Sequence, residues 1–233
     1  MPGLRFMNYG YYKDSFCPDL SVNDEKERYP IHLYHYLCSK VDMKNLNILE
    51  VGSGRGGGAD YILRTFKPRK VSAIDISITA VNLCKELYTD NNLDFLYGSA
   101  EDIPFSNNTF DLILNVESSH CYPNFDNFLR EVARVLKPSS YLLITDFRPS
   151  SELDSFRTSI TSFFDVISEE EITDNILSAL DLMSSKRSKQ IKTFLPSFLN
   201  SISASFAGIK GSELYNSFQN KDLRYFMYVL KTK

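Results

Sequence analysis

The sequence predicts an α/β fold, a doubly wound and mostly parallel sheet with helices on both faces. Three observations lead to this prediction. Short apolar runs alternate with amphipathic helical patterns between about residues 45 and 145. Such runs are typical of parallel strands buried on both faces, which helices connect. A glycine-rich turn follows the first run, and a helical insertion, which we expect to form a lid, precedes the last one.

The predicted elements follow one another in a regular order. The central strands are expected at residues 47–51, 71–75, 93–97, 110–115 and 141–145. The helices between them are expected at residues 58–66, 79–91 and 125–136. A helix over 152–162 leads to a sixth strand over 163–167, and the seventh covers 223–230. Together they form a seven-stranded Rossmann-like sheet, in which ligands bind at the carboxyl ends of the strands.

Three regions divide the chain. Residues 1–44 are expected to form an N-terminal helical cap after a start rich in glycine and tyrosine, and residues 45–150 form the ligand-binding core. Residues 151–233 complete the sheet and contain the helical lid, residues 169–206. The lid supplies apolar side chains for a substrate pocket, namely Phe194, Leu195, Phe198, Leu199 and Phe206.

The bulk composition excludes several classes of protein. With 233 residues, 43% hydrophobic and 24% charged, the chain has the composition of an ordinary globular protein. A net charge of −3 does not favour nucleic acid as a partner. The sequence shows no secretory signal and no apolar run long enough to span a membrane, so we expect a cytoplasmic protein. The four cysteines lack metal-ligand spacing, which predicts reduced thiols and no metal site.

The first strand runs into the glycine-rich stretch EVGSGRGGG. Gly52, Gly54 and Gly56 allow a sharp turn and a close approach to a ligand, at which the next helix directs its N-terminus. Asp75 ends the second strand, where a carboxylate can accept both hydroxyls of a ribose. These features predict an adenosine-containing cofactor, either NAD or S-adenosylmethionine (SAM). Glu50 favours SAM because its carboxylate would repel a pyrophosphate, although the stretch also satisfies the GxGxxG pattern of dinucleotide-binding turns.

An ordered series of segments carries a family resemblance: LEVGSGRGG, IDIS, GSAEDIPFSNNTFD, ESSHCYP and FLREVARVLKP. With them the chain resembles the class I SAM-dependent methyltransferases, in the small-molecule branch of the methyltransferase 11 type, over about residues 46–148. The resemblance implies SAM as the cofactor, with Gly52, Ser53 and Gly54 under its methionine portion. It also implies that Glu50 anchors the ammonium group indirectly.

The resemblance extends to the rest of the cofactor. It implies that Asp75 holds the ribose hydroxyls and that Ile76 covers one face of the adenine. Ala100 and Glu101 are expected to meet the adenine edge, and Asn115 is expected to lie near the sulfonium. The resemblance therefore places the cofactor across the carboxyl ends of the first, second and fourth strands.

The N-terminal stretch FMNYGYY resembles an Asn/His-x-Gly-Tyr-Trp element that closes over SAM in sugar and polyketide O-methyltransferases. It implies that Tyr11 or Tyr12 covers the cofactor, although a tyrosine here can equally belong to an aromatic strap that packs on the core. The chain departs from the family pattern at Ser99, where many relatives have an aspartate that contacts the adenine amino group. It also departs at KPSSYLL, where relatives usually have a Pro-Gly-Gly turn.

His120 and Asp146 are the predicted catalytic residues. His120 follows the fourth strand and Asp146 follows the fifth, so adjacent strands would bring both side chains to one edge of the sheet. A neutral histidine can remove the proton of a hydroxyl acceptor near neutral pH, and a carboxylate can orient the imidazole. The stretch ESSH also resembles the E-S-x-H of methyltransferases for rebeccamycin-type sugars, in which a His-Asp pair is catalytic.

The segments ESSHCYP and FAGIKGSELY further resemble the mycobacterial phthiotriol dimycocerosate O-methyltransferases, which act on lipidic alcohols. We therefore expect a SAM-dependent O-methyltransferase of secondary metabolism that acts on a hydroxyl of an apolar small molecule, such as a lipid, polyketide or glycoside. The alternatives are C- or N-methylation of a sterol-like or amine acceptor, a non-catalytic SAM-binding protein and, more weakly, an NAD-dependent oxidoreductase. The sequence leaves open the acceptor and the oligomeric state, with a homodimer as one option.

Overall fold

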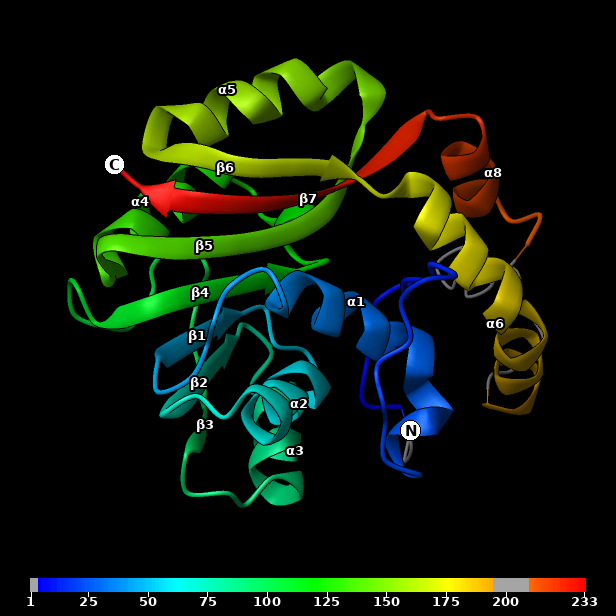
Figure 1. Cartoon of the computed structure of the whole chain (residues 1–233), viewed down its shortest axis with the longest axis horizontal. Helices are drawn as coiled ribbons and strands as arrows, with labels where there is room; N and C mark the ends of the chain where they lie inside the picture. The colour runs from blue at the N-terminus through cyan, green and yellow to red at the C-terminus, as the bar shows by residue number, and fades with distance from the viewer. Residues whose placement is uncertain (1–3, 195–209) are drawn as a thin grey trace.

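The computed structural model describes residues 4–194 and 210–233, and the side chains of residues 185–194 are not part of the description. One sheet runs through the molecule in the strand order β3-β2-β1-β4-β5-β7-β6 (Figure 1). Its strands are β1 (Asn47–Val51), β2 (Lys70–Asp75), β3 (Leu93–Tyr97), β4 (Phe110–Val116), β5 (Leu136–Pro149), β6 (Phe164–Glu171) and β7 (Leu223–Thr232). The predicted seven-stranded, doubly wound sheet is confirmed.

The pairing directions explain where ligands can bind. The strands from β3 to β5 are parallel, whereas β7 is antiparallel to both β5 and β6. The chain moves outward in one direction from β1 to β3 and then returns to place β4 on the other side of β1. This reversal creates a crevice at the carboxyl ends of β1 and β4, which is the usual ligand site of an open α/β sheet.

Helices cover both faces of the sheet, as the sequence predicts. They are α1 (Arg28–Cys38), α2 (Gly57–Phe66), α3 (Ile78–Leu87), α4 (Phe125–Val135), α5 (Leu153–Phe163), α6 (Thr173–Phe194) and α8 (Glu213–Gln219). Short 3-10 turns lie at η1 (Asp24–Glu27), η2 (Ser119–Cys121) and η3 (Ser150–Glu152). One hydrophobic core joins the sheet to α1, α2, α3, α6 and α8, and a second joins it to α4 and α5.

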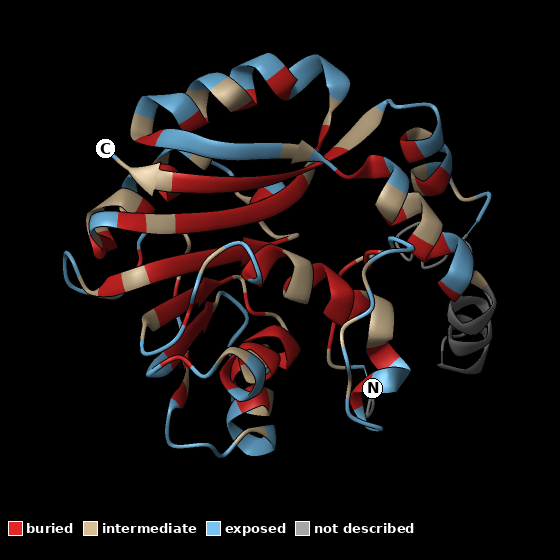
Figure 2. Cartoon of the chain, in the orientation of Figure 1, coloured by how far each residue is buried: buried red, intermediate tan, exposed pale blue. Residues whose placement is uncertain are grey.

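Burial follows the position of each strand in the sheet. The central strands β1, β4 and β5 are buried along most of their length, whereas β6 is mostly exposed at the edge (Figure 2). This contrast is expected because a central strand is covered on both faces and paired on both sides. The crevice at the carboxyl ends of β1 and β4 is therefore built on buried strands that are paired on both sides.

Three predicted boundaries are wrong. The fifth strand does not end at Thr145, because β7 continues to pair with β5 as far as Pro149, after the pairing with β4 has stopped. The sixth strand extends to Glu171 for the same reason, which removes residues 169–171 from the predicted lid. The helix predicted over residues 79–91, α3 in the structure, ends at Leu87, since Tyr88 adopts an extended conformation.

The N-terminal region differs from expectation, and the lid is described only in part. In the N-terminal region, the helices span only 24–38, and an extended strap of residues 4–12 precedes them. In the lid, α6 forms one helix after β6. The predicted pocket residues Leu195, Phe198, Leu199 and Phe206 lie outside the described residues, and so does the side chain of Phe194. Their assignment to a substrate pocket stays a prediction.

Candidate active site

The glycine-rich turn leaves β1 in a conformation that only glycine adopts without strain. Gly52 and Gly54 have φ values of 77° and 53°, in the left-handed region. A Cβ atom on Gly52 would lie 1.9 Å from the Oγ of Ser118, so the position also requires a residue without a side chain. A Cβ on Gly54 would meet only the Sδ of Met7, at 3.5 Å. The backbone at Gly54 is thus open to a group lying between the turn and the strap.

Asp75 holds this turn in place from the end of β2. Its Oδ2 accepts a hydrogen bond of 2.7 Å from the backbone N–H of Gly54, and its Oδ1 accepts one of 2.9 Å from that of Ser77. The backbone N–H groups of Gly52 and Ser53 both donate to the carbonyl of Ile74, which joins the turn to β2. Asp75, which is predicted to bind the ribose, and the glycine turn, which is predicted to lie under the methionine portion of SAM, are therefore connected by hydrogen bonds.

Glu50 lies beneath the turn and is completely buried. The hydroxyl of Tyr34 donates a 2.7 Å hydrogen bond to its Oε1, while Oε2 has no partner among the described residues. Burial raises the pKa of Glu50 to about 7, against the opposing effect of the hydrogen bonds from Tyr34 and from the backbone of Ala59. Because the carboxyl group does not reach the surface, Glu50 can act on a ligand only through its neighbours.

Asn115 occupies the end of β4 with no exposed surface. Its Nδ2 donates to the carbonyl of Val51 at 3.0 Å and to the hydroxyl of Tyr122 at 2.8 Å. The Oδ1 of Asn115 is buried without a partner among the described residues. A buried amide oxygen without a partner is uncommon in a folded protein and therefore marks this position. The hydroxyl of Tyr122 also meets the Oγ of Ser118, at 2.7 Å.

The residues predicted to meet the adenine also lie at this end of the sheet. Ile76 follows β2 directly and is 69% exposed, which is unusual for an isoleucine beside a buried strand. Glu101 accepts a 3.1 Å hydrogen bond from the backbone of Asn124, and its own N–H donates to the Oγ of Ser99. Ala100 packs on the second core. The structure thus groups these residues, and their contacts with adenine stay a prediction.

Taken together, these residues fit a SAM molecule. The glycine turn offers close backbone approach, Asp75 offers a carboxylate for hydroxyl groups, and Asn115 offers an unpaired acceptor. Ile76 offers an exposed apolar side chain beside them. Each of these features matches one chemical part of the cofactor, since SAM combines an amino acid, a ribose and an adenine.

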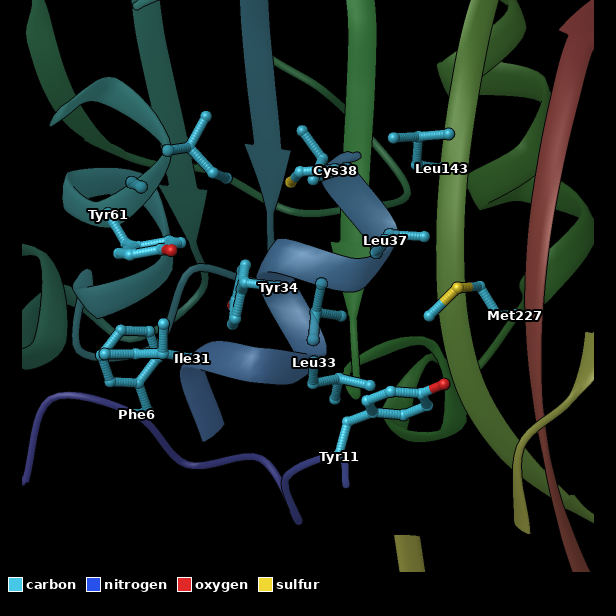
Figure 3. Packing of buried hydrophobic residues seen from close by; sticks show 14 of the residues in the cluster. Phe6, Tyr11, Ile31, Leu33, Tyr34, Leu37, Cys38, Tyr61, Leu143 and Met227 are labelled. Atoms are coloured by element: carbon cyan, nitrogen blue, oxygen red, sulfur yellow. The ribbon is translucent and has the colours of Figure 1, made fainter. Parts of the chain in front are cut away.

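The structure places Tyr11, one of the two tyrosines predicted to cover the cofactor, in the core. Its side chain is completely buried, stacks on Tyr36 with ring centroids 4.5 Å apart, and belongs to the core around α1 (Figure 3). Tyr12 is half-buried and donates its hydroxyl to Asp14. The alternative reading of the FMNYGYY stretch, an aromatic strap that packs on the core, holds for Tyr11. The strap residues that reach the site are instead Met7, above Gly54, and Tyr9.

His120 and Asp146 lie together at the neighbouring strand ends, as the sequence predicts. The Nδ1 of His120 is 2.8 Å from the Oδ1 of Asp146, which lies inside β5 at the first residue beyond its pairing with β4. The His120 side chain is 30% exposed, whereas that of Asp146 is completely buried. The pair therefore has one solvent-facing member and one structural member.

Asp146 is held as a carboxylate by a dense set of donors. Its Oδ2 accepts hydrogen bonds from the Oγ of Ser119 at 2.6 Å and from the backbone N–H of His120 at 2.9 Å. The guanidinium of Arg148 lies 3.3 Å from the same oxygen. Burial opposes ionisation, but the donors and the cations His120 and Arg148 prevail and lower the pKa of Asp146 to about 2. In return, the Asp146 carboxylate raises the pKa of His120 against the effect of its burial.

The sequence placed Glu117 near the site but did not show which residues hold it there. Glu117 accepts a 2.8 Å hydrogen bond from the backbone N–H of Tyr9 and a 2.7 Å hydrogen bond from the hydroxyl of Tyr225 on β7. Burial raises its pKa to about 7. Its φ of 45° is a strained value for glutamate, and such strain is common at functional sites. The signal in the sequence was only the position of Glu117 beside His120.

Other chemistries find less support in the described residues. Cys121 is exposed overall, but partial burial of its thiol raises the pKa of that group. A raised pKa opposes a role as nucleophile. Within residues 4–194 and 210–233, no three His, Cys, Asp or Glu side chains gather where they could hold a metal ion. No helix in this part of the chain is long and apolar enough to cross a membrane.

Comparison with known proteins identifies the family. A methyltransferase domain matches residues 49–144, which contain the glycine turn, β2, β3 and most of the strands that carry the site. The phthiotriol/phenolphthiotriol dimycocerosates methyltransferase of Mycobacterium tuberculosis is 36% identical over 227 residues, which cover 97% of this chain and 84% of that protein. The chain therefore belongs to the class I SAM-dependent methyltransferases. It is an enzyme that uses SAM.

A further curated relative and a solved structure are also similar to this chain. A fatty-acid O-methyltransferase of Mycolicibacterium smegmatis is 44% identical over 156 residues, covering 66% of this chain and 57% of that protein. The crystal structure of geranyl diphosphate C-methyltransferase from Streptomyces coelicolor, in complex with S-adenosyl-L-homocysteine, superposes with a TM-score of 0.71 at 15% identity. That alignment covers 99% of this chain and 93% of the other, and at this identity it shows the shared fold alone.

Proposed function

We propose that this methyltransferase transfers the methyl group of SAM to the oxygen of an apolar small molecule, with His120 as general base and Asp146 as the residue that orients it. The observation that carries this proposal is the 2.8 Å contact between the two side chains. Because Asp146 is ionised, it can only accept a hydrogen bond, so the proton of neutral His120 lies on Nδ1. The lone pair on Nε2 is then available for the acceptor's proton.

The cofactor supplies a methyl group bound to a positively charged sulfur, which is a good leaving group. The chain supplies alignment and proton removal. Gly52, Gly54 and Asp75 would hold the cofactor across the strand ends, and His120 would take the proton of the acceptor hydroxyl. Asp146 keeps the imidazole oriented and stabilises its charged form after the transfer.

An aromatic cluster around His120 supports an apolar acceptor. The ring of Phe147 lies 4.4 Å from that of His120, and Tyr9 and Phe218 pack on Phe147 at 5.9 and 5.6 Å. These rings come from the strap, β5 and α8, so three distant segments form one apolar wall beside the base. The similarity to methyltransferases named for phthiotriol lipids and fatty acids points in the same direction. We propose a long-chain lipidic acceptor.

Purified enzyme with SAM and a panel of long-chain alcohols, phenols and fatty acids would test the proposal. With a hydroxyl acceptor, His120→Ala should lower kcat by about 10²- to 10⁴-fold, while SAM affinity by calorimetry stays near the wild-type value. Cys121→Ser, at the adjacent exposed position, is the matched control. A carboxylate acceptor is already deprotonated, so its methylation should be much less sensitive to His120→Ala. Near wild-type turnover of the preferred alcohol by His120→Ala would refute the base role.

A further inference from the structure

Arg148 lies behind the His120–Asp146 pair, two residues after Asp146 on β5. Its side chain is only 9% exposed. Nη2 donates a 2.7 Å hydrogen bond to the Oγ of Ser119, and Nη1 donates one of 2.6 Å to the carbonyl of Phe147. Since Ser119 in turn donates to Asp146, the guanidinium reaches the carboxylate both directly and through the serine.

The second core holds this cation from the opposite side. The guanidinium carbon lies 4.4 Å from the ring centroid of Phe156 on α5 and 5.3 Å from that of Phe125 on α4. These distances are those of cation–π interactions, and such interactions are stronger when water is excluded. Arg148 therefore cannot swing away to solvent without breaking contacts with two helices as well as with the site.

The arrangement places two opposing influences on His120. Asp146 favours the charged imidazolium, because an adjacent carboxylate stabilises a positive charge. Arg148 places a permanent positive charge next to the same carboxylate and so disfavours the imidazolium. A base must be neutral to accept a proton and must release that proton after each turnover. A carboxylate without a cationic partner would orient His120 but would also raise its pKa further.

We propose that Arg148 is a positioning residue that holds Asp146 in place and offsets part of the effect of that carboxylate on His120, so that His120 can accept the proton of the methyl acceptor and release it after each turnover. The inference rests on the base role proposed for His120. In that step the acceptor oxygen forms its bond to the methyl carbon while the carbon–sulfur bond breaks, with its electron pair going to sulfur. The hydroxyl proton moves to Nε2 of His120 and then to solvent, a release that the nearby guanidinium favours.

Other ionisable groups lie around His120, Asp146 and Arg148, and the test must separate their titration from that of His120. Asp146 faces it from β5, Glu117 from the segment after β4, and Cys121 from η2. Glu152 of η3 lies beside Arg148 at the surface of the second core. Glu117 has a pKa raised to about 7, so its own titration would overlap a pH profile measured near neutral pH. Measurements in a Glu117→Gln background remove that overlap.

The test compares Arg148→Met with Arg148→Lys, which keeps the charge. The imidazole titration of His120 can be followed by NMR, since the chain has only three histidines and His120→Gln identifies the signal. We expect Arg148→Met to move the His120 midpoint upward by about one pH unit, as loss of a nearby like charge predicts. The acid limb of the kcat/KM profile should move by the same amount, so that high pH restores activity. Arg148→Lys should keep a near wild-type profile at a reduced rate.

Two controls separate this role from a purely structural one. Ser119→Ala breaks the serine bridge but keeps the guanidinium, so it should lower the rate at every pH with little movement of the profile. It also serves if Arg148→Met does not fold. An unchanged His120 midpoint in Arg148→Met, or an equal loss at every pH in Arg148→Met and Arg148→Lys, would overturn the inference. If the midpoint moves but His120→Ala retains full turnover, Arg148 tunes His120 as inferred and the proposed base role fails.

Discussion

The site has a predicted cofactor half, with Glu50 and the glycine turn, and a proposed acceptor half, with His120 and Asp146. The two halves stabilise a buried acid in different ways. Each places a completely buried acid at the carboxyl end of a central strand, Glu50 on β1 and Asp146 on β5. The pKa of Glu50 is raised to about 7, whereas that of Asp146 is lowered to about 2. Burial acts against ionisation in both, so burial does not explain the difference.

The partners of each acid explain it. Glu50 receives hydrogen bonds from Tyr34 and from a backbone N–H, both of them neutral donors. Asp146 accepts hydrogen bonds from Ser119, from backbone N–H groups and from His120, and it also lies beside the cationic guanidinium of Arg148. Hydrogen bonds from charged donors are about twice as strong as those from neutral donors. The acceptor half is therefore built from fixed charges, and the cofactor half from backbone geometry with neutral hydrogen bonds.

The largest expected effect comes from removing the charge at the acceptor half. Asp146→Asn keeps the size of the side chain but lets its amide donate to His120, which favours the wrong tautomer and removes the stabilising charge. We expect kcat to fall by about 10²- to 10⁴-fold, with little change in SAM affinity. Steady-state kinetics and calorimetry check this prediction. A comparable loss of SAM binding would show that the two halves are not independent.

The cofactor half should respond in the opposite way. Asp75→Ala removes a carboxylate that holds the Gly54 backbone and is predicted to bind the ribose hydroxyls. Each lost charge-assisted hydrogen bond costs about 1.5–3 kcal/mol, so SAM affinity should fall by about 10- to 100-fold or more. The pH profile of kcat should keep its shape, because the acceptor half is intact. Unchanged calorimetric affinity would contradict the ribose assignment.

Glu50 should make stability depend on pH. Its folded pKa, about 7, exceeds the ordinary value near 4.5, so the folded state binds the proton more tightly than the unfolded state. Stability from this group is present at acid pH and is lost as pH rises through about 7, by up to about 3 kcal/mol. Denaturant unfolding of Glu50→Gln should show a weaker loss between pH 5 and 8. Because Glu117 titrates in the same direction, the loss should weaken further in the double variant.

The smallest effect is expected at Cys121. The thiol is exposed beside His120 but is not activated, so Cys121→Ser should change kcat/KM less than about twofold. The same assay on wild-type enzyme treated with a thiol reagent is the comparison. Loss of activity after treatment but not in Cys121→Ser would indicate steric blockage rather than loss of a nucleophile. A large loss of activity in the serine variant would make Cys121 a catalytic candidate and would weaken the contrast between the two halves.

Periodicity and motif order were sufficient for the sheet and for the contact between His120 and Asp146. Adjacent parallel strands end at one edge, so residues that follow them meet whatever the details of packing. The failures lie where non-local pairing decides. The extension of β5 to Pro149 depends on β7, which lies far away in the sequence. Tyr11 and Tyr9 are two residues apart in similar surroundings, and only packing against α1 sends one to the core and the other to the site.

The sequence by itself determined the order of the strands, the glycine turn and the meeting of His120 with Asp146, because glycine turns, strand ends and their order are local properties of the chain, and its resemblance to known methyltransferases implied the class and the cofactor. Only the tertiary structure decided the charge state of the site. Arg148, Ser119 and Asp146 come from η2 and β5, and Glu117 meets Tyr225 from β7. A pKa depends on burial and on neighbours within a few ångströms, and these neighbours are brought together by folding rather than by sequence proximity.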